Sequence, residues 1–150
     1  MSGHVLGTDH TAIAVSDLTH ELGYWQQVLG FTLLGTTEVG GPLPEQETGV
    51  PGLRSRLAML ALHGQTVELY QPLAPGSRAS YRPSPADIGS WHLAFRVADL
   101  DALIRDSAPW GWQVRGQVAV VTEGPGPVGA RLAYLHNTDG TILEFIQLPR

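Results

Sequence analysis

The hydrophobic and polar positions of this chain alternate in short segments, which favours β-strands, and they change to helical spacing at one place in each half. Residues 10–15 alternate and are rich in β-forming side chains, so we predict a strand there. Apolar residues then recur at helical spacing at Leu18, Leu22, Trp25, Val28 and Leu29. We place the N-cap of this helix at Ser16, with Asp17 in its first turn, and its end at Gly30.

The rest of the first half predicts three more strands. Residues 31–39 read as one strand, followed by a loop at 40–52 that is rich in Gly, Pro and Glu. Residues 55–62 and 66–71 read as a hairpin that turns at His63 and Gly64. The predicted order of elements is therefore β-α-β-β-β.

The second half repeats this order after a segment rich in Pro and Ser at 72–90. We predict a strand at 92–97, a helix at 99–108 and strands at 112–121, 131–136 and 141–147, with a Gly/Pro loop at 122–129. The sequence itself recurs, because Val15-Ser16-Asp17-Leu18 returns as Val97-Ala98-Asp99-Leu100. Such a repeat indicates two copies of one unit that share a core.

These segments predict an α+β protein in one domain, residues 1–150. Module one covers about 8–72, a linker about 73–90, and module two about 91–149. We expect the two tandem β-α-β-β-β modules to form an open, barrel-like mixed sheet around a cavity.

Composition removes several classes of function. The 150 residues carry a net charge of −5 without a basic cluster, which argues against binding nucleic acid. There is no Cys, so disulfides and thiolate chemistry are excluded. No signal segment or apolar run of about 20 residues is present, so we expect no membrane contact and a cytoplasmic location.

Each module carries one His and one Glu at matching places. His10 and His92 begin the first strand of their modules, and Glu68 and Glu144 lie in the last strands. A lone His or Glu in a strand is more often structural, but two repeated pairs of metal-ligand types favour one divalent metal site. A pseudo-twofold axis between the modules would bring the four side chains to one centre.

Strand alternation places other residues on the same face as these pairs. Ala12 and Ala14 follow His10 inward, and Ala94 and Arg96 follow His92, which leaves room for a ligand. Arg96 pairs with Glu68, Glu144 or Asp99, or the strand twists it to the rim, or it binds a carboxylate or phosphate group of a substrate. Tyr70 shares the face of Glu68 and either donates a hydrogen bond to a substrate or forms the wall.

Four short motifs together resemble the vicinal oxygen chelate superfamily. They are Asp-His-x-x-x-x-Val at 9–15, Val-Glu-Leu at 67–69, Trp-His-x-x-x-x-Val at 91–97 and Leu-Glu-Phe at 143–145. The resemblance covers about residues 8–149. The superfamily includes glyoxalase I, methylmalonyl-CoA epimerase, extradiol dioxygenases, and fosfomycin and bleomycin resistance proteins.

The resemblance implies a glyoxalase-like fold around a metal-centred cavity, with His10, Glu68, His92 and Glu144 as ligands. It implies a divalent-metal-dependent lyase or isomerase, in which a small oxygenated substrate chelates the metal and a proton is transferred through a metal-bound enolate. Glu144 is then the candidate base and Glu68 its symmetric partner. Two imidazoles and two carboxylates suit Ni, Co, Zn, Mn or Fe(II), so the metal stays open.

Two other classes stay open as well, a ligand-binding protein of the bleomycin-resistance type and an Fe(II) dioxygenase. The second catalytic Glu of the epimerase has no counterpart in residues 53–57, although Glu45 and Glu47 lie in the nearby loop. We expect a small-molecule substrate and a homodimer. The metal site lies either within one chain or across the dimer interface.

Overall fold

The computed structural model describes residues 3–76, 79 and 81–150 of the chain. These residues fall into two compact units, residues 1–78 and 79–150, which we call unit 1 and unit 2. The boundary between the units lies inside the segment that the sequence predicts to be a linker.

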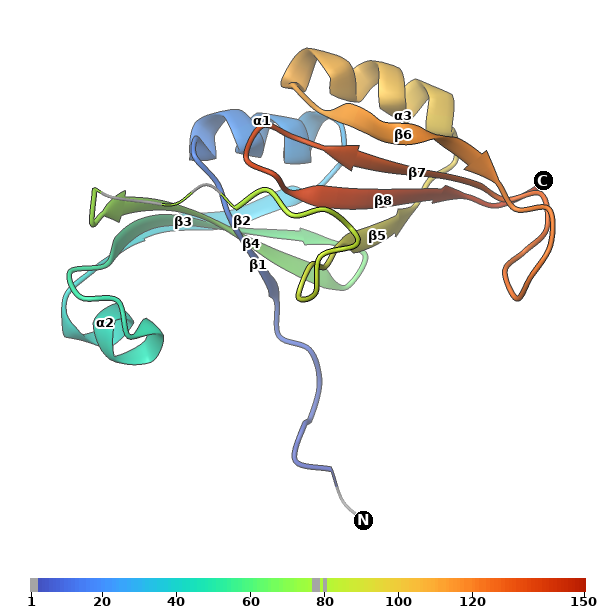
Figure 1. The fold of residues 1–150 in the computed structure, drawn as a ribbon. Helices are drawn as coiled ribbons and strands as arrows, with labels where there is room; N and C mark the ends of the chain where they lie inside the picture. The colour runs from blue at the N-terminus through green and yellow to red at the C-terminus, as the bar shows by residue number, and fades with distance from the viewer. Residues whose placement is uncertain (1–2, 77–78, 80) are drawn as a thin grey trace. The chain divides into compact units, whose positions relative to one another are not determined.

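Unit 1 holds a four-stranded sheet with the strand order β1-β4-β3-β2 (Figure 1). Strand β1 pairs in parallel with β4, and the other two pairings are antiparallel. Its elements follow the chain as β1 (Thr11–Ala14), α1 (Leu18–Gln27), β2 (Thr32–Val39), α2 (Pro42–Thr48), β3 (Arg54–Leu62) and β4 (Gln65–Ala74).

Unit 2 repeats the arrangement with the strand order β5-β8-β7-β6. Strand β5 is parallel to β8, and β7 is antiparallel to both of its neighbours. Its elements are β5 (Leu93–Arg96), α3 (Leu100–Ser107), the 3₁₀ turn η1 (Ala108–Trp110), β6 (Gln113–Val120), β7 (Arg131–His136) and β8 (Ile142–Gln147). The predicted α+β class and the repeated β-α-β-β-β order are confirmed.

One face of each sheet forms a core with its helix. Helix α1 packs on β3 and β4 within unit 1, and α3 packs on β6, β7 and β8 within unit 2 (Figure 1). The apolar residues that alternate inward toward these helices are buried, among them Leu60, Val67, Leu69, Leu135, Leu143 and Phe145. Because successive strand residues point to opposite faces, the Glu between two buried apolar residues lies on the other face.

The helices begin in the same way in both units, one residue later than the sequence predicts for α1. Asp17, and not Ser16, is the N-cap of α1, and its carboxylate accepts a hydrogen bond from the backbone N–H of His20 at 3.0 Å. Asp99 caps α3 in the same way through the N–H of Ala102 at 2.9 Å. The predicted N-cap at Ser16 was wrong by one residue, because Asp17 still has the extended backbone of an N-cap, with φ of −135° and ψ of 101°, and the helix begins after it.

A glutamine on the last strand of each unit completes both helix starts. Gln71 accepts from the N–H of Leu18 at 3.3 Å, and Gln147 accepts from the N–H of Leu100 at 2.9 Å. The first turn of a helix has no backbone acceptors of its own for these N–H groups. Each glutamine therefore ties its helix to the strand that carries Glu68 or Glu144.

A tight turn fixes the register between β7 and β8. The side-chain oxygen of Asn137 accepts from the N–H groups of Asp139 and Thr141 at 3.1 and 3.0 Å. A Cβ at Gly140 would lie 2.5 Å from the carbonyl oxygen of Tyr81, so this position excludes any larger residue. The turn places Tyr134 directly opposite Glu144.

The helix α2 is a difference from the sequence prediction, which assigns a loop to residues 40–52. Pro42 occupies the first turn, where its missing N–H costs nothing, and the C-cap Gly49 has φ of 71°. The predicted hairpin strand at 66–71 also extends to Ala74, and His10 and His92 lie immediately before β1 and β5 rather than within them. No helix in the described part of the chain is long and apolar enough to cross a membrane.

Candidate metal-binding site

In unit 1, Glu68 lies on the sheet face that the helix leaves uncovered. Its neighbours in register are Ala12 on β1 and Met59 on β3. Val67 and Leu69 are buried on the opposite face, whereas Glu68 is only partly buried. The carboxylate therefore stays accessible to a ligand while its strand is anchored in the core.

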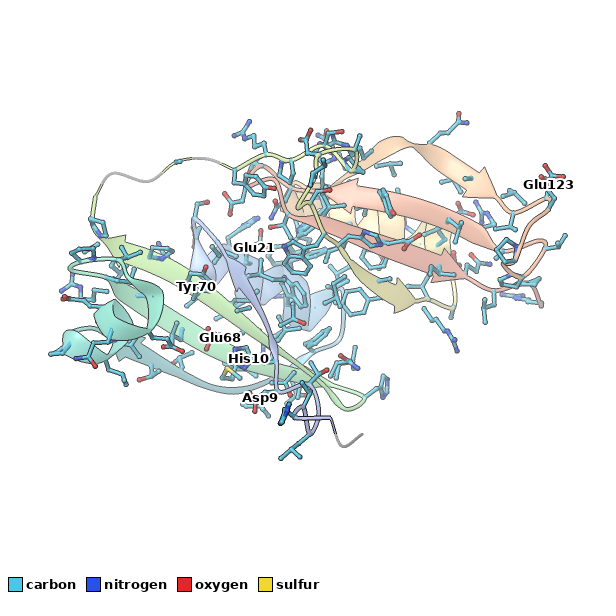
Figure 2. The ribbon with its side chains drawn as sticks, turned by 60° about the horizontal axis from the view of Figure 1, so that its bottom comes forward. Asp9, His10, Glu21, Glu68, Tyr70 and Glu123 are labelled. Atoms are coloured by element: carbon cyan, nitrogen blue, oxygen red, sulfur yellow. The ribbon has the colours of Figure 1, made fainter. Side chains whose placement is uncertain are left out.

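His10 approaches Glu68 from the start of β1. Figure 2 shows the two side chains beside each other, with Asp9 next to them. Nδ1 of His10 lies 2.7 Å from a carboxylate oxygen of Asp9. Because an ionised carboxylate only accepts hydrogen bonds, Nδ1 is the donor.

Negative charges around His10 raise its pKa above the usual value. The hydrogen bond to Asp9 is the main cause, and the charges of Glu68, Asp9 and Glu47 add to it, while burial opposes them. Glu47 belongs to α2, so the carboxylate that the sequence left unplaced acts on His10. The imidazole therefore stands among carboxylates, as a metal ligand would.

Unit 2 brings its predicted pair into direct contact. Nε2 of His92 donates a hydrogen bond to Oε2 of Glu144 at 3.1 Å. Glu144 lies between Ala94 and Tyr134 in register, and its side chain is 18% exposed against 37% for His92. A carboxylate and an imidazole that lie in contact and are both partly exposed are suited to bind the same cation.

Tyr134 joins this pair, although the sequence reasoning did not single it out. Its hydroxyl lies 3.5 Å from Nε2 of His92, and the two ring centroids are 4.9 Å apart. Burial, and then the charge of Glu144, raise the pKa of Tyr134, so its phenol stays neutral. The turn at residues 137–140 could have predicted this position from the sequence, because it sets the register in which Tyr134 lies opposite Glu144.

The two predicted substrate-binding residues lie on the same faces as the pairs. Tyr70 lies on the Glu68 face of β4 between Ala14 and Leu57, and it is half-buried. Arg96 is exposed at the end of β5 and forms no ion pair with Glu144 or Asp99 in unit 2 as described. Pairing with either of these carboxylates, one of the alternatives for Arg96, is therefore not observed.

Arg115 is a further residue that the sequence reasoning missed. It lies on β6 in register with Tyr134 and is half-buried, and no hydrogen bond or ion pair involves it in the described residues. It therefore adds a second guanidinium to the face that carries Arg96.

The site chemistry fits a divalent metal through its donor types. Within each unit, one imidazole and one carboxylate lie together, and such nitrogen and oxygen donors bind Zn, Mn, Fe, Co and Ni. Among residues 3–76, 79 and 81–150, no group of three or more His, Asp or Glu that could hold a metal ion is found. Each pair by itself supplies two ligands.

The sequence matches a known family over most of its length. The profile of the Glyoxalase/Bleomycin resistance protein/Dioxygenase superfamily covers residues 9–128. The chain belongs to this superfamily. The resemblance to vicinal oxygen chelate proteins that the four motifs indicate is thereby confirmed.

A curated relative and solved structures agree with this assignment. The chain is 34% identical over 145 residues to a 2-epi-5-epi-valiolone epimerase from an Actinomyces species, a match that covers 93% of this chain and 78% of that protein. A glyoxalase family protein from Bacillus cereus has a TM-score of 0.82 at 23% identity and covers 98% of this chain and 97% of that one. The fosfomycin resistance protein FosX from Listeria monocytogenes, complexed with Mn(II) and sulfate, has a TM-score of 0.63 at 14% identity and covers 97% and 94%. At these identities the structural matches establish the fold.

Proposed function

We propose that this protein is a divalent-metal-dependent epimerase of the glyoxalase superfamily that acts on a small oxygenated ketone. The repeated His/Glu pair carries the proposal, because Glu68 and Glu144 lie on the face of their sheet that the helix leaves uncovered, and the His92–Glu144 pair is in contact at 3.1 Å. The epimerase relative supports isomerase over lyase chemistry.

The proposed ligands are His10 and Glu68 from unit 1 and His92 and Glu144 from unit 2. When bound, the metal would polarise two neighbouring oxygens of the substrate and make the adjacent C–H group more acidic. Ni, Co, Zn, Mn and Fe(II) all suit this donor set. The four ligands come either from one chain or from the two chains of a homodimer.

The reaction needs two proton carriers, because an epimerase inverts a stereocentre. We propose that Glu144 removes the proton from the carbon beside the ketone, so that the C–H electron pair forms a C=C bond and the π pair of the ketone moves onto its oxygen. Protonated Glu68 is the proposed donor of the proton that the same carbon then takes up, as the ketone re-forms and the epimer results. The proton count balances, because each turnover moves one proton to Glu144 and one from Glu68, and solvent restores both.

Neighbouring side chains supply hydrogen bonds for an oxygen-rich substrate. Arg96 and Tyr70 are the proposed binding residues, because Arg96 is exposed and Tyr70 is half-buried on the face of its pair. Tyr134 adds a neutral hydroxyl beside His92 and Glu144. These groups favour a small oxygenated molecule as the substrate, and the arginines favour one with a negative charge.

The metal assignment is tested by elemental mass spectrometry of the purified protein. We expect about one equivalent of a divalent transition metal per chain, which a His10→Ala/His92→Ala variant loses because it lacks two of the four proposed ligands. A His4→Ala/His20→Ala variant is the matched control and keeps the metal. If wild type takes up none of the five metals after incubation with each, the proposal is wrong.

The reaction is tested by proton NMR of 2-epi-5-epi-valiolone in D₂O with the metal-loaded protein. We expect deuterium to enter beside the ketone and an epimer to accumulate. Metal binding without exchange or epimer would contradict the epimerase assignment, and oxygen uptake by the Fe(II)-loaded protein would favour a dioxygenase. Chelator-insensitive binding without turnover would favour the resistance-type binding protein. A homodimer and a cytoplasmic location stay predictions.

A further inference from the structure

We propose that Asp9 is a positioning residue that holds the His10 ring so that Nε2 is the nitrogen offered to the metal. The inference rests on the proposed function, because it concerns one ligand of that metal site. It assigns a role to the residue that precedes the histidine. This residue is Asp9 in unit 1 and Trp91 in unit 2.

The hydrogen bond between Asp9 and His10 decides which ring nitrogen is free. A neutral imidazole carries one N–H, and the carboxylate of Asp9, 2.7 Å from Nδ1, can only accept. The hydrogen therefore stays on Nδ1, and the lone pair stays on Nε2. A carboxylate in this position is the usual way in which proteins orient a metal-binding imidazole.

In the described residues of unit 2, no carboxylate makes an equivalent contact with Nδ1 of His92. Trp91 precedes His92, and an indole has no acceptor for a ring N–H. Nε2 of His92 instead donates to Glu144, the proposed ligand of the same unit. His92 is thus held by a group that must release it when a metal binds, whereas His10 is held by a group on the other side of the ring.

The exposure of Asp9 and His10 sets how much their contact contributes to metal affinity. The Asp9 side chain is 94% exposed and that of His10 is 36% exposed, so water competes with the contact. Loss of such an outer partner weakens metal binding by about 10- to 100-fold, and we expect the lower end of this range here.

The first test reads the tautomer of His10 in metal-free protein. We would record nitrogen–proton correlation spectra of protein labelled with ¹⁵N-histidine, at a pH well above the His10 pKa, and assign His10 with a His10→Ala variant. We expect the hydrogen on Nδ1 in wild type and in Asp9→Asn, whose amide oxygen can accept the same bond. In Asp9→Ala we expect the hydrogen to be shared with Nε2.

The second test measures metal affinity by competition with a chromophoric chelator for Co(II) and Zn(II) at the same pH. We expect Asp9→Ala to bind about 10-fold more weakly than wild type, with Asp9→Asn closer to wild type. Glu47→Gln is the matched control, because it removes a negative charge that acts on His10 without a hydrogen bond. We expect it to change neither tautomer nor affinity.

The outcomes separate this inference from the proposed function. Normal metal binding with an unchanged tautomer in Asp9→Ala would overturn the role of Asp9 and leave the metal site in place. Equal weakening in Asp9→Ala and Asp9→Asn, with wild-type tautomers in both, would make Asp9 a ligand itself and would also overturn it. A wild type that binds no metal overturns both proposals.

Discussion

The two units share a fold but differ in the chemistry of the face that their helix leaves open. In unit 1 the row in register is Ala12, Glu68 and Met59, and in unit 2 it is Ala94, Glu144 and Tyr134. Both helices start from an Asp cap and a Gln from the last strand. The parts that hold the fold together are therefore repeated, whereas the residues beside the repeated Glu68 and Glu144 differ, as Met59 and Tyr134 do.

The difference has a physical reason. An N-cap or a buried strand residue contributes to the stability of each unit, so neither copy can lose it without cost. A side chain on an open face makes few contacts and can change freely. Unit 1 there presents Met59 and Leu57 beside its pair, while unit 2 presents Tyr134, Arg96 and Arg115. The His and Glu at matching places are the exception, because they are repeated in both units although neither lies in a core. Such repetition is typical of residues that share a functional role.

The largest expected effect comes from exchanging the two carboxylates for amides, one at a time. Glu144→Gln should slow deuterium exchange into 2-epi-5-epi-valiolone by about 100- to 10,000-fold, since it removes the base. Glu68→Gln should keep exchange but form no epimer, because Glu144 can then return a deuteron only to the face from which it removed the proton. Metal content of both variants is measured as a control. Wild-type epimerisation in either variant would contradict the two-carboxylate mechanism.

A smaller effect is expected at the place where Met59 and Tyr134 correspond. Tyr134→Phe should weaken binding of acetohydroxamate, a probe with two neighbouring oxygens, to the metal-loaded protein by about 10-fold, the value of one hydrogen bond to a charged group. Met59→Leu should leave it unchanged. Tyr81→Phe removes an exposed phenol elsewhere in unit 2 and serves as the control for calorimetric titration. Equal affinities in all three variants would exclude Tyr134 from the substrate.

The repeated glutamines should contribute to stability alike. Gln71→Ala and Gln147→Ala each remove an acceptor from a helix N-terminus and should lower the free energy of unfolding by about 1 kcal/mol. Urea denaturation measures this value, and Gln46→Ala, on the exposed part of α2, is a control. A large loss in one unit only would show that the resemblance of the two helix starts is superficial.

The smallest effect concerns pH and belongs to unit 1. The pKa of His10 is raised in the folded protein, mainly by Asp9, so protonated His10 stabilises the fold. This contribution is complete below the unfolded value of about 6.5 and is lost as the pH rises through the folded pKa. Metal-free wild type should therefore exceed Asp9→Ala in Tm at weakly acidic pH and match it at alkaline pH. A constant difference across the range would contradict this assignment.

Much of the fold follows from local sequence. Alternation at 10–15 and 92–97 predicts the first strands, and the recurrence of one segment predicts the duplication. Local signals failed at α2, because Gly and Pro mark both loops and helix ends, and the helix depends on Pro42 and Gly49 at its two ends. Ser16 and Asp17 are both good caps, and only backbone geometry chooses between them.

The candidate site shows the same division. The sequence identifies the residues that can bind a metal, because imidazole and carboxylate chemistry belongs to the residue type. It also shows that these residues recur at matching places in the two modules. The sequence does not show which side chains they contact. That Asp9 holds His10, that Glu144 holds His92, and that Tyr134 and Arg115 stand on the Glu144 face depend on strand register and side-chain rotamers. These are set by turns and packing between segments far apart in the chain, so only the tertiary structure decides them.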